Sequence, residues 1–195
     1  MPEIAPTFIS RRLIGFALGA ALALAAVAVL AGTAAASRSQ IAMFQDYRAL
    51  SAPQATLQQI RALGASTVRV IVPWATIAPG PHRTRKPSFD ATNLSAYPAI
   101  NWQPYDQIDR DGAEDGITVD FTVSGGAPRW AEGSGIPSQN VDNEFDAWMP
   151  NATDYGQFVR AVGTRYDERF TPRGASSPLP AVRFWAIYNE PNSTA

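Results

Sequence analysis

The sequence contains no cysteine and a single histidine, His82, among its 195 residues. Without cysteine, neither a disulfide framework nor a thiolate metal site is possible. With one histidine, a metal site built from a histidine cluster is excluded. Any serine–histidine pair would also have to use His82.

An excess of charge of one sign is lacking as well. The chain has 16 basic and 17 acidic residues, which gives a formal net charge of −1. That balance gives no reason to expect a nucleic acid partner. The 46% content of hydrophobic residues is that of a globular protein with one domain's worth of core.

The N-terminal segment has the pattern of a secretory signal peptide. Arg11 and Arg12 precede an uncharged run over residues 13–37 that is rich in Ala, Leu and Val, and residues 34–36 offer a small-residue cleavage site. We therefore expect residues 1–36 to be removed and the mature protein, residues 37–195, to be secreted. The alternative is an uncleaved anchor that faces outside, since the run exceeds the ~20 residues that a membrane span needs.

After residue 37, short apolar segments alternate with helical segments. The predicted strands cover residues 41–44, 67–72, 117–123 and a run that begins at 182. The predicted helices cover residues 51–64, 104–116 and 151–170. This alternation favours a parallel sheet with crossover helices. A doubly wound nucleotide-binding fold shares it, but that fold would usually carry a glycine-rich turn after the first strand, and none is present.

Local signals suggest where these helices begin and which faces they bury. In the first helix, Ser51 is the expected N-cap, and Leu57, Ile60 and Leu63 form the expected buried stripe. Pro104 is expected to open the second helix, because proline is tolerated in the first turn. Long polar segments follow the second and third strands, and in barrels this end of the strands carries the chemistry.

The most informative stretch covers residues 182–192 and reads Val-Arg-Phe-Trp-Ala-Ile-Tyr-Asn-Glu-Pro-Asn. Its apolar half has strand length, and the strand must end at Pro191, which cannot donate to a sheet ladder. Asn189 and Glu190 thus lie at the carboxyl end of a strand that we expect to be buried on both faces. A carboxylate there is costly unless it has a task or a partner. The alternative is an ordinary strand-to-loop turn.

This stretch resembles the fourth-strand motif of clan A glycoside hydrolases, which are retaining TIM-barrel enzymes. The nearest pattern, Trp-Glu-Ile-Trp-Asn-Glu-Pro-Asn, is typical of glycoside hydrolase family 39 and related cellulase-like barrels. Ala186 and Tyr188 replace its Glu and second Trp, whereas residues 189–192 match. Residues 67–74 and 127–131 resemble the second strand and the third-strand exit of the same enzymes. Ser124 stands where many family 5 members carry His, which argues against family 5 proper.

The resemblance implies hydrolysis of O-glycosyl bonds in poly- or oligosaccharides by double displacement, with no metal and no organic cofactor. In it, Glu190 is the general acid/base and Asn189 holds the sugar 2-hydroxyl. The implied fold is an α/β (β/α)8 TIM barrel that is truncated after its fourth strand. The nucleophile of this clan is a Glu at the end of strand 7, so we expect it beyond Ala195.

Four further residues are candidates for the substrate site. The resemblance implies that Arg69 lies under the site and supports the nucleophile; the alternative is an ion pair with Asp120 on the adjoining strand. Trp74 and Trp130 either stack on sugar rings or pack beneath the long loops. Asp46 either binds a sugar hydroxyl or caps a loop.

A function from another class also fits the sequence. A non-catalytic extracellular carbohydrate-binding or interaction protein, built on a degenerate barrel, would keep the aromatic residues but never contact a nucleophile. The two hypotheses differ in what the gene encodes downstream of residue 195.

Overall fold

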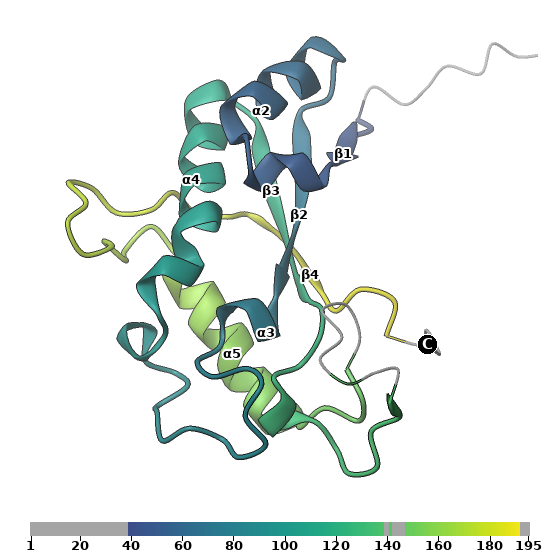
Figure 1. Cartoon of the computed structure of the whole chain (residues 1–195). Coiled ribbons are helices and arrows are strands. Elements are labelled where there is room, and N and C mark those ends of the chain that lie inside the picture. The colour runs from purple at the N-terminus through teal and green to yellow at the C-terminus, as the bar shows by residue number, and fades with distance from the viewer. Residues whose placement is uncertain (1–38, 139–140, 142–146, 192–195) are drawn as a thin grey trace, which may run out of the picture. The chain divides into compact units, whose positions relative to one another are not determined.

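A computed structural model describes residues 39–138, 141 and 147–191 (Figure 1). The chain divides into two units, Met1–Gln40 and Ile41–Ala195, and the architecture below is that of the second unit. The predicted signal segment, residues 1–36, lies outside the described residues. Within the described ranges, no helix has both the length and the apolar character that a membrane span requires.

The second unit is an α/β structure with a four-stranded parallel sheet. Its strands are β1 (Met43–Gln45), β2 (Thr67–Pro73), β3 (Thr118–Ser124) and β4 (Phe184–Ile187). The α-helices are α2 (Pro53–Ala62), α3 (Trp74–Ile77), α4 (Ala99–Asp115) and α5 (Ala152–Arg165). Short 3-10 helices are η1 (Tyr47–Leu50), η2 (Leu94–Ala96) and η3 (Arg129–Ala131). The predicted alternation of strands and helices is confirmed.

The strand order in the sheet is β1-β2-β3-β4, the same as the order along the chain. A doubly wound sheet reverses its order at a switch point, and no reversal occurs among these strands. Right-handed crossovers without a reversal place successive helices on the same face of the sheet. The helices accordingly lie on one side of the strands in Figure 1. The opposite face is left to the polar residues described below.

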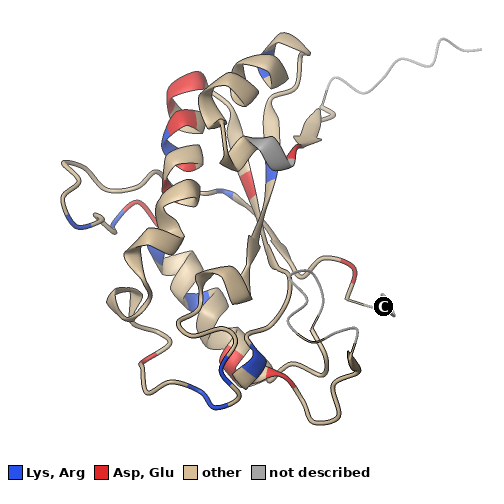
Figure 2. Ribbon diagram, viewed as in Figure 1, with Lys and Arg blue, Asp and Glu red and all other residues tan. Residues whose placement is uncertain are grey.

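The side chains of β2 separate by period-2 alternation. Val68, Val70 and Val72 are buried against the helices, whereas Arg69 and Ile71 are only half-buried on the other face. The buried face continues into a single core that takes side chains from each of the longer helices: Leu57, Ile60, Tyr105, Ile108, Phe158 and Val162. Charged residues lie mainly on the helices and loops (Figure 2).

A partly buried ion pair connects α4 to α5. Arg165 donates from Nε and Nη2 to the two carboxylate oxygens of Asp106, at 2.8 and 2.5 Å. The hydroxyl of Tyr166 donates to the same carboxylate at 3.0 Å. The guanidinium carbon lies 4.7 Å from the ring centroids of both Trp102 and Phe170. Such bidentate pairs tolerate partial burial because each charge has a partner of opposite sign.

The predicted start of the second helix is wrong. Helix α4 begins at Ala99, with Pro98 as its N-cap residue, and Pro104 lies in its interior. There Pro104 cannot donate to the carbonyl of Ile100, which a helical residue at that position normally would. The proline that marks the helix start is Pro98. Trp102, which precedes the predicted start, is therefore helical, and its side chain is buried.

Helix α2 also differs from the prediction at both ends. Its N-cap residue is Ala52, with no side-chain cap, so Ser51 does not have the expected role. Leu57 and Ile60 are buried as predicted, but Leu63 is exposed. Leu63 is the C-cap residue, one position beyond the last helical residue, and the buried stripe ends one turn earlier, at Ile60.

The prediction that β4 is buried on both faces is wrong. Among the described residues β4 pairs only with β3, so it is an edge strand. Phe184, Trp185 and Ile187 are exposed, Ile187 to 57%. An apolar edge strand of this kind can pair with further strands.

Asp109 on α4 is a buried acid that should make stability depend on pH. It is 3% exposed, and its Oδ2 has no hydrogen-bond partner among the described residues. Burial, assisted by the charge of Asp106, raises the pKa of Asp109 to about 7, against the opposing effect of Arg110. The pKa in the unfolded chain is about 3.9. At pH values between these two pKa values, Asp109 is ionised in the unfolded chain but stays protonated in the folded protein.

The free energy of unfolding should therefore fall as pH rises from about 4 to 7, by at most about 1.4 kcal/mol per pH unit from this group. Asp109→Asn removes the ionisation. We expect the Tm of the variant minus the Tm of the wild type to be clearly more positive at pH 8 than at pH 4. Glu114→Gln, an exposed site on the same helix, is the matched control. An Asp109→Asn difference that is equal at both pH values would contradict the assignment.

Candidate active site

Arg69 connects three strands on the polar face of the sheet. Its Nε donates to Thr122 Oγ1 on β3 at 2.8 Å, and its Nη1 donates to Gln45 Oε1 on β1 at 2.9 Å. Its Nη2 donates to Oδ1 of Asn189, just past β4, at 2.9 Å. The structure thus brings two of the predicted site residues, Arg69 and Asn189, into direct contact.

Asp120 lies beside Arg69 in the register of β2 with β3, but it accepts none of the three hydrogen bonds that Arg69 donates. The two residues are Cα partners in the pairing of β2 with β3. Asp120 is 8% exposed, and its buried Oδ1 has no hydrogen-bond partner among the described residues. Burial raises the pKa of Asp120, and the positive charge of Arg69 opposes that shift. Arg69 thus affects Asp120 by its charge, whereas its three side-chain hydrogen bonds go to other residues.

The turn after β4 has an unusual backbone. Tyr188 and Glu190 have φ angles of +61° and +48°, which residues other than glycine rarely adopt. Two hydrogen bonds to β3 hold the turn: Tyr188 N donates to the Val123 carbonyl at 2.9 Å, and Asn189 N donates to Ser124 Oγ at 2.7 Å. Such conformations persist only where the surroundings fix them, and they are concentrated at functional sites.

Glu190 is exposed at the end of this turn, and Asn189 is half-buried. The expectation that Glu190 is a buried carboxylate is therefore wrong, because β4 is an edge strand. Its position still matches the prediction in one respect: it follows a parallel strand at the carboxyl edge of the sheet, beside Asn189. Asp46 lies at the same edge, half-buried directly after β1, and its backbone carbonyl accepts from Ala49 N at 3.1 Å.

The two candidate tryptophans have different surroundings. Trp74 is 1% exposed, and its ring lies 5.9 Å from the stacked ring of Phe158 and 5.6 Å from that of Tyr155. The structure thus places Trp74 in the core, with no ring face presented to a sugar. Trp130 packs edge-on against Trp74 at 5.8 Å but is only half-buried, and its indole N–H donates to the Pro79 carbonyl at 3.3 Å.

The loop after β2 covers part of the Trp130 ring. The ammonium of Lys86 lies 5.5 Å from the ring centroid and pairs with Asp154 at 2.5 Å. The Phe89 ring lies 5.8 Å from the same ring. Because the ring is only half-buried, Trp130 remains a candidate for substrate contact, beside the paired side chains of Lys86 and Asp154.

Sequence reasoning missed several residues that build this site. Thr122 and Ser124 both take part, and with Asp120 they occupy alternate positions of β3. That polar alternation in an otherwise apolar strand was the available signal. Nothing in the sequence pointed to Tyr155, whose hydroxyl donates to the Val123 carbonyl at 2.6 Å. Burial raises its pKa to about 12, with a smaller contribution from Tyr188.

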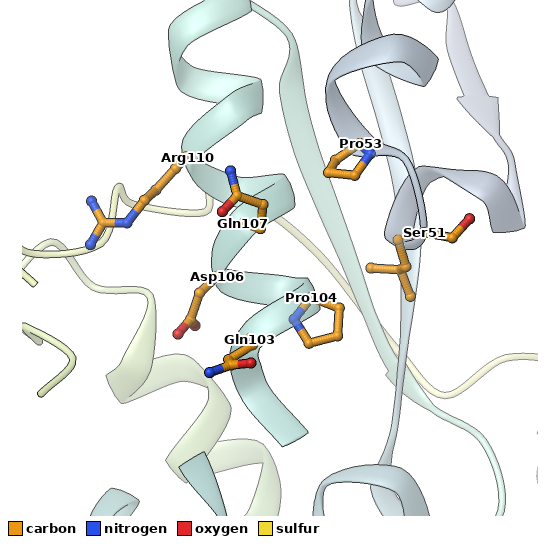
Figure 3. Close-up of a pocket in the computed structure, with 8 residues that line it drawn as sticks. Ser51, Pro53, Gln103, Pro104, Asp106, Gln107 and Arg110 are labelled. Atoms are coloured by element: carbon orange, nitrogen blue, oxygen red, sulfur yellow. The ribbon is translucent and has the colours of Figure 1, made fainter. Parts of the chain in front are cut away.

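A separate hollow of about 580 Å³ lies in the helical layer, between α4 and the η1–α2 segment (Figure 3). Its lining residues are Leu50, Ser51, Pro53, Gln103, Pro104, Asp106, Gln107 and Arg110. No predicted site residue is among them, and the carboxylate of Asp106 is already engaged by Arg165 and Tyr166. Across the described residues, no three His, Cys, Asp or Glu side chains gather as a metal site would require.

Comparison with known proteins relates the fold to solved structures. No family model and no curated protein matches the sequence. The crystal structure of Fpglu1 from Fervidobacterium pennivoraus matches 73% of this chain at 15% identity, with a TM-score of 0.50. Beta-glucosidase 2 from the fungus Trichoderma reesei, in complex with Tris, matches 73% of the chain at 19% identity, with a TM-score of 0.46.

This chain spans less than a third of either solved protein, 29% of Fpglu1 and 24% of the beta-glucosidase. At these identities the likeness concerns the fold alone. The parallel α/β arrangement of the chain is thus similar to one part of Fpglu1.

Proposed function

We propose that this chain is the N-terminal half of the TIM barrel of a retaining glycoside hydrolase, with Glu190 as its general acid/base. The observation that carries the proposal is the contact of Arg69 with Asn189 across the sheet. It joins the one charged residue of β2 to the Asn-Glu-Pro turn at the carboxyl edge, where barrel enzymes carry out their chemistry.

The geometry of the turn suits the proposed roles. Glu190 is exposed, so its carboxyl group can reach a glycosidic oxygen. Asn189 is held by its backbone and its side chain, so it can bind a substrate hydroxyl, which we propose is the sugar 2-hydroxyl. A retaining mechanism needs a second carboxylate ~5–5.5 Å from the first. We propose that a Glu beyond Ala195 supplies it.

The edge position of β4 supports the half-barrel interpretation. Strands in sequential order, with helices on one side, are the arrangement that closes into a barrel when more units are added. Phe184 and Ile187 lie on opposite faces of β4, and both are exposed. A fifth strand and its helix would bury this apolar surface.

The test is the activity of the complete gene product on a panel of aryl glycosides, with the anomeric configuration of the first-formed sugar followed by ¹H NMR. We expect turnover with retained configuration. Inverted product would contradict the retaining mechanism. Carbohydrate binding without turnover of any substrate would favour the non-catalytic alternative.

We also propose that the protein is exported, on the strength of the N-terminal pattern in the sequence. Expression of the complete gene in a secreting host should yield a product in the medium that begins at Ser37. Intact mass and N-terminal sequencing measure this directly. A membrane-bound product that retains residues 1–36 would support the anchor instead.

A further inference from the structure

The side-chain amide of Asn189 has two chemically different sides. A guanidinium group carries only hydrogen-bond donors, so it can face only the amide oxygen. Arg69 Nη2 donates to that oxygen, Oδ1, at 2.9 Å. The NH₂ group of Asn189 must then point away from Arg69. The backbone N–H of Asn189 is held separately by Ser124, so the remaining freedom lies in the torsions of the side chain.

The direction of the Arg69 donor is itself fixed. Thr122 and Gln45 accept from the other two nitrogens of the guanidinium, at 2.8 and 2.9 Å. Because the guanidinium is planar and its donors form a rigid fork, two fixed edges determine the third. A lysine ammonium on a flexible stem cannot reproduce this arrangement.

We propose that Arg69 is a positioning residue that acts through Asn189, by turning the NH₂ group of its amide toward an oxygen atom of the substrate. This inference rests on the proposed function, because it requires a sugar hydroxyl at that position. It differs from support of a nucleophile, since the partner of Arg69 is Asn189 itself. The substrate atom in question must accept a hydrogen bond from Asn189.

The first test compares two replacements of Asn189 in the complete gene product. Asn189→Asp keeps an oxygen for Arg69 but has no NH₂ group, and Asn189→Ala has neither. We expect both variants to lose kcat/KM by about tenfold on a glycoside with its 2-hydroxyl, and to lose little on the 2-deoxy analogue. If Asn189→Asp keeps wild-type activity on the hydroxylated substrate, the amide presents its oxygen and the inference is overturned.

The second test is a double-mutant cycle. Arg69→Lys should cost about tenfold in kcat/KM on the hydroxylated substrate. It should cost little on the 2-deoxy substrate and little in the Asn189→Ala background, because its effect passes through the amide. Arg61→Lys, a remote exposed arginine bonded to the Asp115 carbonyl, is the matched control. Equal losses on both substrates, additive with Asn189→Ala, would show that Arg69 acts independently.

A third measurement does not depend on activity. The side-chain NH₂ resonances of Asn189, assigned by their absence in Asn189→Ala, report how the amide is held. We expect two separate proton signals in the wild type and in Arg61→Lys, and shifted or exchange-broadened signals in Arg69→Lys. Unchanged signals in Arg69→Lys would overturn the positioning role. If the wild type cleaves no glycoside, the proposed function fails, and this spectrum still decides whether Arg69 orients the amide.

Discussion

Glu190→Ala in the complete gene product should lower kcat/KM on natural glycosides by roughly 10² to 10⁴, the usual value of a positioned general acid. The same variant should still form the glycosyl-enzyme from a dinitrophenyl glycoside. Dinitrophenolate is a good leaving group that needs little protonation, so the first step loses little. Steady-state rates with both substrate types, together with the burst of dinitrophenolate, measure the difference.

The second step of the reaction gives an independent check. Without Glu190 no base activates water, so the glycosyl-enzyme should accumulate and be visible by intact mass. Azide needs no base, and it should restore turnover and give a glycosyl azide of retained configuration. Glu168→Ala, which removes an exposed carboxylate that contacts Arg183, is the matched control. Equal losses on both substrate types, with no effect of azide, would show that Glu190 is not the acid/base.

Trp74→Ala should lower the free energy of unfolding by roughly 3–5 kcal/mol, the cost of deleting a large buried aromatic side chain. The ring is 1% exposed and touches three other rings, those of Trp130, Tyr155 and Phe158. Its loss would leave a cavity between α3 and α5. Urea unfolding, or Tm where unfolding is irreversible, measures the effect in the complete gene product.

Trp130→Ala is the matched comparison, because it removes the same residue type from a half-buried position. We expect a smaller loss of stability from this variant. A Trp74→Ala protein with unchanged Tm but a raised KM would contradict the core assignment and restore the sugar-contact hypothesis for Trp74.

The sheet and the open edge of its last strand were predictable from sequence, whereas the exposure of that strand's two faces was not. The β-branched residues of β2 and the alternation of β3 are local signals, and they located both strands. The burial of β4 depends on what packs against it, which its own apolar sequence does not report. The start of α4 was misplaced because this segment contains two prolines. The backbone geometry shows that Pro98 precedes the first turn of α4 and that Pro104 lies in its interior.

The site shows the same division. Arg69 was predicted as a lone charge in an apolar strand, and Asn189 as part of a motif. Their contact joins residues 120 positions apart, and it depends on the strand order, in which β3 alone separates β2 from β4. The position of Trp74 directly after β2 fitted both a core and a surface role. The four-residue helix α3, which turns the ring inward, decided between them.

The sequential order of the strands has a consequence for how the chain acquires its structure. Each new strand–helix unit can dock on the edge left by the preceding unit, so no strand has to be inserted between two that are already paired. The sheet can thus assemble from the N-terminus onward, in the direction of synthesis. At the stage that ends with β4, the growing edge displays Phe184, Trp185 and Ile187. A ribosomal pause at the point where β4 has left the exit tunnel would expose this apolar edge, so the rate of elongation would affect aggregation.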